Sequence, residues 1–93
     1  MEKIMLIKMV KSEQYNKIIL TYVKIEENET DKFKGYPEYV EWIEDLGIFN
    51  KITKQDFGKV IEAETQYSKP DYLGKCKIEL KNIISNGRKI EIR

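Results

Sequence analysis

Histidine is absent from the 93 residues of this chain. Its absence removes the most common general base, the usual zinc ligand and every nucleophile that a histidine activates. No phosphate-binding glycine loop takes over that role, because the five glycines are scattered singly. We therefore expect a protein that is not an enzyme and that has no metal site and no cofactor.

Cysteine is almost as scarce. Cys76 is the only one, so no internal disulfide can form. We expect Cys76 to be a small buried residue of the core rather than a reactive thiol. The longest apolar run, Ile4 to Ile7, is far too short for a signal sequence or a membrane span. These absences predict a cytoplasmic protein that does not associate with membranes.

What the chain does contain is charge, which makes up 35% of its residues and leaves a net charge of only +1. The distribution is uneven. Residues 1–25 carry five bases and two acids, residues 26–45 two bases and eight acids, and residues 46–93 ten bases and six acids. The length and the apolar share of 41% predict a single domain over residues 1–93.

Two strands are predicted in the first third of the chain. Residues 3–10 have apolar side chains on both faces, which favours a central strand. A polar turn over residues 12–16 leads into a second, β-branched strand at residues 17–26. Residues 27–32 lack periodicity and are expected to form a mobile loop.

The one predicted helix covers residues 35–47. Pro37 suits its first turn, Gly47 suits its C-terminal cap, and Tyr39, Trp42 and Leu46 recur at helical spacing. The alternative is a strand, because residues 40–42 alternate between apolar and polar. Residues 48–55 are ambiguous and leave open a short strand around residues 51–52.

The last third predicts two hairpins. Strands at residues 58–67 and 73–82 are joined by a turn at residues 68–71, in a register that places Ala63 opposite Cys76 and the two acids Glu62 and Glu64 opposite Lys77 and Lys75. The preferred type I′ pair Asn86-Gly87 then closes a second hairpin with Ile83 opposite Ile90. The inward residues change parity between the hairpins, so a β-bulge is expected near residues 81–82.

Together these elements predict an α+β fold that is mainly β, in the order β-β-α-(β)-β-β-β. The expected architecture is a small bent antiparallel sheet or a partly open five- to six-stranded barrel, with one short helix covering a face. An OB-like or SH3-like barrel has a comparable size and strand number, which is an analogy of architecture and not a family match.

Two functions are compatible with these patterns. The first is single-stranded nucleic-acid binding through the basic C-terminal sheet, where aromatic rings stack on bases and cations follow phosphates. Its predicted residues are Tyr67, Tyr72, Lys75, Lys77, Lys81, Arg88 and Lys89. The second is a small regulator or inhibitor that docks on a basic protein surface through the acidic segment 26–45, in the manner of a nucleic-acid mimic. Its predicted residues are Glu38, Glu41, Glu44 and Asp45.

Overall fold

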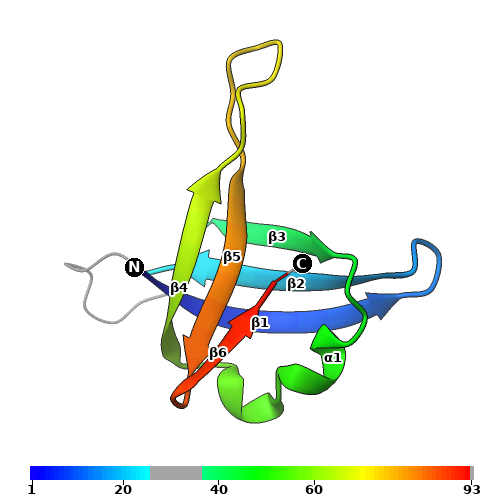
Figure 1. Ribbon diagram of the computed structural model, residues 1–93, viewed down its shortest axis with the longest axis vertical. Coiled ribbons are helices and arrows are strands. Elements are labelled where there is room, and N and C mark those ends of the chain that lie inside the picture. Colours follow the sequence, from blue (N-terminus) through cyan, green and yellow to red (C-terminus); the bar gives the residue numbers. More distant parts are fainter. Residues whose placement is uncertain (26–36, 93) are drawn as a thin grey trace.

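The computed structural model describes residues 1–25 and 37–92 of the chain. Its central element is an open sheet of six antiparallel strands in the order β3-β2-β1-β4-β5-β6 (Figure 1). The strands are β1 (Glu2–Ser12), β2 (Lys17–Lys24), β3 (Glu38–Ile43), β4 (Val60–Tyr67), β5 (Ile78–Ser85) and β6 (Arg88–Glu91), and two short helical segments are α1 (Ile48–Lys51) and the 3₁₀ turn η1 (Lys54–Asp56). The predicted mainly β, antiparallel fold is confirmed. The loop predicted at residues 27–32 lies outside the described residues.

β1 lies in the middle of the sheet, as its apolar residues on both faces predict. It pairs with β2 on one side and with β4 on the other. Its register against β2 shifts between Leu6 and Lys8, which leaves Ile7 as an extra residue. Such a bulge bends a strand and increases its twist. In Figure 1 the group β1–β2–β3 crosses the pair β4–β5, which gives the sheet its strong bend.

The helix predicted at residues 35–47 is wrong, and the alternative strand is correct. β3 pairs with β2 over its whole length, with Tyr39 opposite Tyr22 and Ile43 opposite Ile18. A short isolated helix has an unfavourable nucleation cost, whereas the edge of β2 offers this segment a complete ladder of backbone partners. Residues 35–36 of the predicted helix lie outside the described part of the chain.

The helix that exists begins after Gly47, which lies at its N-terminal end rather than at the C-terminal cap predicted for it. The short strand left open around residues 51–52 is also wrong, because α1 ends there and η1 follows. Figure 1 places these two segments at the open end below the crossing strands. The order of elements is therefore β-β-β-α-β-β-β, with three strands before the helix.

The core lies inside the bend of the sheet, where the two crossing groups of strands face each other. Its members share near-complete burial and come from every strand and from α1; they include Ile4, Leu6, Ile18, Leu20, Tyr22, Ile43, Ile48, Ile61, Ala63, Leu80, Ile83 and Ile90. Ile48 and Ile52 bring the helical segment onto this cluster, so α1 closes one end of the core. No helix in the described part of the chain is long and apolar enough to cross a membrane.

The predicted register between β4 and β5 is wrong. Ala63 lies opposite Ile83 instead of Cys76, and the partners of Glu62 and Glu64 are Ile84 and Asn82 instead of lysines. Matching opposite charges across the pair favoured a four-residue turn, but burial of Ile83 and Leu80 in the core outweighs exposed ion pairs, which contribute little. The chain between the strands is consequently much longer than predicted, and Cys76 is exposed rather than buried.

The strand predicted at residues 73–82 begins only at Ile78, and the chain reverses at residues 71–74 rather than 68–71. The expected bulge and the second hairpin are confirmed. The register of β4 against β5 shifts so that Lys81 is the extra residue, which is the bulge expected near residues 81–82. Ile83 lies opposite Ile90. The turn residues Asn86 and Gly87 both have positive φ, 53° and 75°, as a type I′ turn requires.

Candidate nucleic-acid interface

Residues 68–77 form a narrow projection, here called the arm, that continues the β4–β5 hairpin away from the rest of the molecule (Figure 1). At its base the Ser68 N–H donates to the Lys77 carbonyl at 2.8 Å, and the Lys77 N–H donates to Ser68 Oγ at 2.9 Å. At its tip Asp71 Oδ1 accepts the N–H groups of Leu73 and Lys75 at 2.8 and 3.0 Å. These bonds satisfy the backbone of the arm locally, so its side chains are left to face solvent.

The arm is basic and carries exposed aromatic rings at both ends. Its lysines, Lys69, Lys75 and Lys77, outnumber its one acid, Asp71. Tyr67, the last residue of β4, is 66% exposed, and Tyr72 at the tip is 94% exposed. Burial does not account for either ring, and neither has an aromatic partner among the described residues.

A groove of about 420 Å³ separates the base of the arm from the free edge of β3, and its lining residues are Tyr39, Val40, Tyr67, Cys76, Lys77 and Ile78. Two of these residues are tyrosines from different strands, Tyr39 of β3 and Tyr67 of β4, and Lys77 supplies a cation. Tyr39 is held from behind by Tyr22, whose ring is stacked on it at a centroid distance of 5.5 Å. Tyr22 is fully buried, so the position of the Tyr39 ring is set by the core.

Glu41 follows the groove residues Tyr39 and Val40 along β3, and its carboxyl group reaches the Leu80 backbone of β5. Burial raises the pKa of its carboxyl group to about 7, although a hydrogen bond from the Leu80 backbone N–H opposes the shift and the nearby Glu79 adds to it. Burial, together with the negative charges of Glu41 and Glu2 and its neighbour Tyr39, also raises the pKa of Tyr22. The charge beside the groove therefore changes near neutral pH.

The predicted nucleic-acid residues fall into two groups. Tyr72, Lys75 and Lys77 lie on the arm and Tyr67 lies next to its base, whereas Arg88 and Lys89 lie at the other end of the β5 strand, in β6. Lys81 is exposed in the bulge between them.

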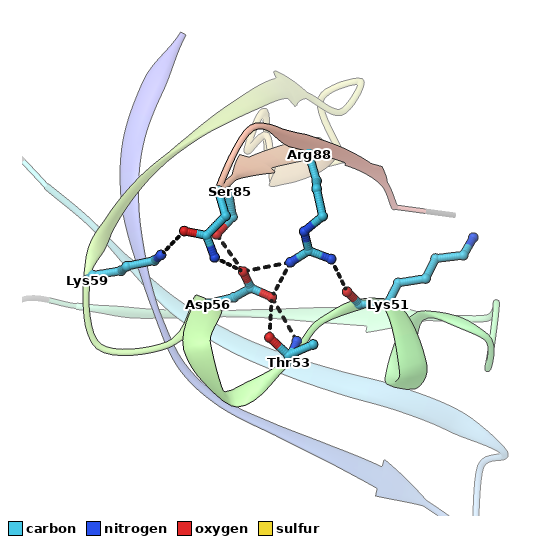
Figure 2. A network of polar contacts seen from close by, with 7 residues as sticks. Lys51, Thr53, Asp56, Lys59, Ser85 and Arg88 are labelled. Atoms are coloured by element: carbon cyan, nitrogen blue, oxygen red, sulfur yellow. Dashed lines mark hydrogen bonds and ion pairs between the residues drawn. The ribbon is translucent and has the colours of Figure 1, made fainter.

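Arg88 has a different environment from the arm lysines, shown in Figure 2. Its Nη2 donates to both carboxylate oxygens of Asp56, at 3.0 and 2.9 Å, and its Nη1 donates to the Lys51 carbonyl at 3.0 Å. Asp56 is fully buried and also accepts Ser85 Oγ at 2.6 Å and the Thr53 N–H at 2.7 Å. Arg88 thus joins the β5–β6 turn to α1 and η1.

The donors around Asp56 determine its protonation. Burial alone would raise the pKa of this carboxyl, but the hydrogen bonds from Ser85, Thr53 and Arg88 and the charge of Arg88 outweigh burial and lower the pKa to about 2. Asn86 extends the network, because its Nδ2 donates to Asp56 at 3.4 Å and its Oδ1 accepts Lys59 Nζ. Asn86 therefore has a role beyond permitting positive φ.

The predicted acidic surface is dispersed because residues 38–43 form a strand. Glu38 and Glu44 face outward, whereas Glu41 lies on the inner face beside Leu20 and Tyr22 of β2. Glu44 is 3.8 Å from Lys17 Nζ. Asp45 accepts the Gly47 N–H at 2.9 Å.

Sequence reasoning missed Tyr39 and Val40 as groove residues, because the helical interpretation assigned Tyr39 to the core. The alternation over residues 38–43 was the available signal, since it separates Tyr39 and Glu41 from Val40 and Trp42. Among the described residues no group of histidine, cysteine, aspartate and glutamate side chains could hold a metal ion. No protein-family model, no curated protein and no solved structure matches the chain.

Proposed function

We propose that this protein is a non-catalytic module that binds single-stranded nucleic acid in the groove between β3 and the arm. The observation that carries the proposal is the meeting of Tyr39, Tyr67 and Lys77 at one groove of about 420 Å³. Nucleic-acid bases stack on aromatic rings whatever their sequence, and lysines neutralise the phosphates between them. The groove therefore offers aromatic rings and a lysine to the same single-stranded nucleic acid.

The arm extends this surface beyond the groove. Lys69 and Lys75 provide further cations, and Tyr72 is a nearly fully exposed ring at the tip. A duplex does not fit this arrangement well, because its bases are already stacked and paired. A single strand offers unstacked bases to Tyr67 and Tyr72, so it is the form of nucleic acid that we propose.

Arg88 is left out of the proposed interface. Its guanidinium is engaged with Asp56 and with the Lys51 carbonyl, and binding a phosphate would compete with these contacts. Lys81 and Lys89 stay in the proposal only as contributors to the overall positive field of this half of the chain. The expectations that the protein is cytoplasmic and has no enzymatic activity stay predictions.

For the barrel type we propose an OB-like rather than an SH3-like arrangement. β1 pairs with both β2 and β4, and α1 follows the third strand. The contact between Glu41 and the Leu80 backbone supports partial closure of the sheet between β3 and β5. The sheet nevertheless has two free edges.

The alternative, a regulator that docks on a basic protein surface, has less support. Of its four predicted residues only Glu38 and Glu44 are exposed, and Glu44 already has Lys17 as a neighbour. The acids at residues 26–31 lie outside the described part of the chain. The proposal therefore favours nucleic acid.

The test is fluorescence anisotropy with a labelled oligothymidylate at several salt concentrations. Tyr67→Ala should weaken binding by about 1–3 kcal/mol, because one stacked base is lost. Lys77→Ala should weaken binding and reduce the slope of log affinity against log salt by about 1. Lys89→Ala is the matched control, since it removes an exposed lysine at the opposite end of β5.

Equal losses from Lys77→Ala and Lys89→Ala would mean that charge is recognised without the groove. An affinity of the unmodified protein that does not fall as salt rises would argue against phosphate contacts altogether. Circular dichroism of each variant establishes that the fold is intact before affinities are compared.

A further inference from the structure

The outer face of β1–β2–β3, the face turned away from the core, carries a second aromatic pair. Trp42 and Tyr15 are in edge-to-face contact, with a ring centroid distance of 5.5 Å and an interplanar angle of 83°. Trp42 is 49% exposed and Tyr15 is 57% exposed. Tyr15 belongs to the β1–β2 turn, so the turn braces the indole and leaves half of it accessible.

The row of side chains that contains Trp42 is apolar. Strand pairing places Trp42 beside Ile19 and Ile19 beside Val10, in one row across the three strands. The next row consists of Val40, Thr21 and Lys8. Val10 and Val40 are each 49% exposed, so they extend the exposed apolar surface of the aromatic pair along this face.

This outer surface is continuous with the groove. Val40 lines the groove and also lies on the outer face two residues before Trp42. Side chains two residues apart on a strand point the same way and are separated by about 6.6 Å. A ligand that passes through the groove and follows β3 therefore reaches Trp42 without crossing another element.

The size of the surface argues against a second copy of this chain as its occupant. Two half-exposed rings and two half-exposed valines offer a few hundred Å², whereas a stable interface needs about 800 Å² from each partner. The charges on this face are mixed: Lys17 precedes Ile19 by two residues on β2, Lys8 lies on β1 in the row of Val40, and Glu38 and Glu44 lie at the edge formed by β3. Because Lys17 partly neutralises Glu44 at 3.8 Å, Lys8 is the cation available to a phosphate.

We propose that Tyr15 and Trp42 form a second base-stacking position for the same single strand that the groove binds. This inference rests on the proposed function and adds a ligand class to it: single strands long enough to extend from the arm, along β3, to the β1–β2 turn. Shorter strands occupy the groove and the arm alone. Affinity should consequently rise with length until the strand covers both positions.

Trp42 is the only tryptophan of the chain, so its fluorescence reports on this position directly. Oligothymidylates of about 4 and about 12 nucleotides span the range of site sizes known for single-strand binders. The long strand should quench Trp42 fluorescence, and the short strand should bind by anisotropy with little quenching. The double variant Tyr15→Ala/Trp42→Ala should lose about 5- to 150-fold in affinity for the long strand and keep its affinity for the short one.

Tyr67→Ala serves as the comparison, because it should weaken the binding of both oligothymidylates. Trp42→Phe should retain most of the affinity for the long strand, since a phenyl ring still stacks, and it guards against misreading a folding defect in the double variant. Binding of the long strand without quenching, or an unchanged affinity in the double variant, overturns the second position while the proposed function stands. Absence of binding by either strand overturns both.

Sedimentation of the unmodified protein tests the remaining explanation for the outer face, which is self-association. A dimer that Trp42→Ala converts to a monomer would assign the outer face to self-association and overturn the inference. A monomer at all concentrations used for binding supports the face as a ligand surface.

Discussion

Strand β5 ends in a basic hairpin in each direction, and the two differ in what surrounds their cations. At the arm, Lys69, Lys75 and Lys77 lie on a projection whose hydrogen bonds are local, and their side chains face solvent. At the Asn86-Gly87 turn, Arg88 is bound to the buried Asp56. The same residue types thus serve as an available surface at one end and as part of the internal structure at the other.

A basic side chain near a turn is therefore evidence for a binding partner only when its contacts within the protein are known. Asp56 is 29 residues from Ser85 and 32 from Arg88 along the chain, and no pattern local to the turn indicates it. The arm shows the converse. Its only carboxylate, Asp71, is used by backbone N–H groups, which leaves the lysines without an acidic partner among the arm residues.

The largest expected difference between the two ends comes from removing their carboxylates. Asp56→Ala leaves the buried Ser85 hydroxyl without its acceptor and removes the carboxylate that the half-exposed Arg88 binds, so the free energy of unfolding should fall by about 3 kcal/mol. Asp71→Ala removes two exposed hydrogen bonds and should cost about 1 kcal/mol. Urea denaturation measures both. Equal losses would show that the arm is as much a part of the cooperative fold as the Asp56 network.

Acid should remove the stability that the Asp56 network contributes at the Asn86-Gly87 turn. The pKa of Asp56 is lowered from 3.8 to about 2 in the folded protein, so the folded state favours the carboxylate. The stabilisation is present above pH 4, amounts to about 2 kcal/mol, and is lost as pH falls through about 2. Denaturation of the unmodified protein at pH 6 and pH 2.5 should show this loss.

The control for that measurement is Asp56→Asn, in which the side chain cannot titrate. This variant should be less stable at pH 6 and should show a shallower decline in acid. If its decline parallels that of the unmodified protein, other carboxyl groups account for the acid sensitivity.

A matched pair of glycine substitutions sharpens the comparison further. Gly74 in the arm and Gly87 in the turn have nearly the same φ, 78° and 75°, and neither has an atom within 4 Å of an added Cβ. Alanine at positive φ costs about 1–2 kcal/mol. Gly87→Ala should lower Tm by about 4–8 °C per kcal/mol, because the turn is tied to the core through Asn86 and Arg88.

Gly74→Ala should lower Tm much less, since the arm can change its conformation without disturbing the core, and it should weaken oligonucleotide binding. Thermal melts and anisotropy on both variants separate the outcomes. An unchanged affinity in Gly74→Ala, with a Tm as low as that of Gly87→Ala, would reverse the assignment of the two ends.

The smallest expected effect concerns Glu41 beside the groove. Its pKa is raised from 4.5 to about 7 in the folded protein, so the folded state holds the proton more tightly than the unfolded state and stability falls as pH rises from about 4.5 to about 7. Over the upper part of that range the carboxylate also gains charge next to a groove that we propose for phosphates. Affinity should therefore decline modestly between pH 6 and pH 8.

Glu41→Gln should remove this decline, because the amide does not titrate. Glu79, which faces Glu41 from β5, provides the control, and Glu79→Gln should keep most of the pH dependence. A decline that persists in Glu41→Gln would show that Glu41 is not its source.

Sequence reasoning succeeded where a local signal and the final structure agree. Asn86-Gly87 is a turn in any context, and the change in parity of the inward residues at Lys81 required a bulge. It failed where a local pattern competed with packing against residues far away in the sequence. Tyr39, Trp42 and Leu46 have helical spacing, yet pairing with β2 decided the conformation of their segment.

The site divides in the same way. Tyr67, Tyr72, Lys75 and Lys77 were identified from the interleaving of aromatic and basic residues in one stretch of chain. Tyr39 and Val40 could not be joined to them from the sequence, because the groove exists only where the bend of the sheet brings the edge of β3 to the base of the arm.

The sequence alone predicts a mainly β protein with a central first strand and two C-terminal hairpins. Periodicity and turn residues act over a few neighbours, and they are enough for that. Tertiary packing sets the register of β4 against β5, the length of the arm, the exposure of Cys76 and the contact of Arg88 with Asp56. Each of these depends on which apolar residues are buried together, and that choice is made by the whole core.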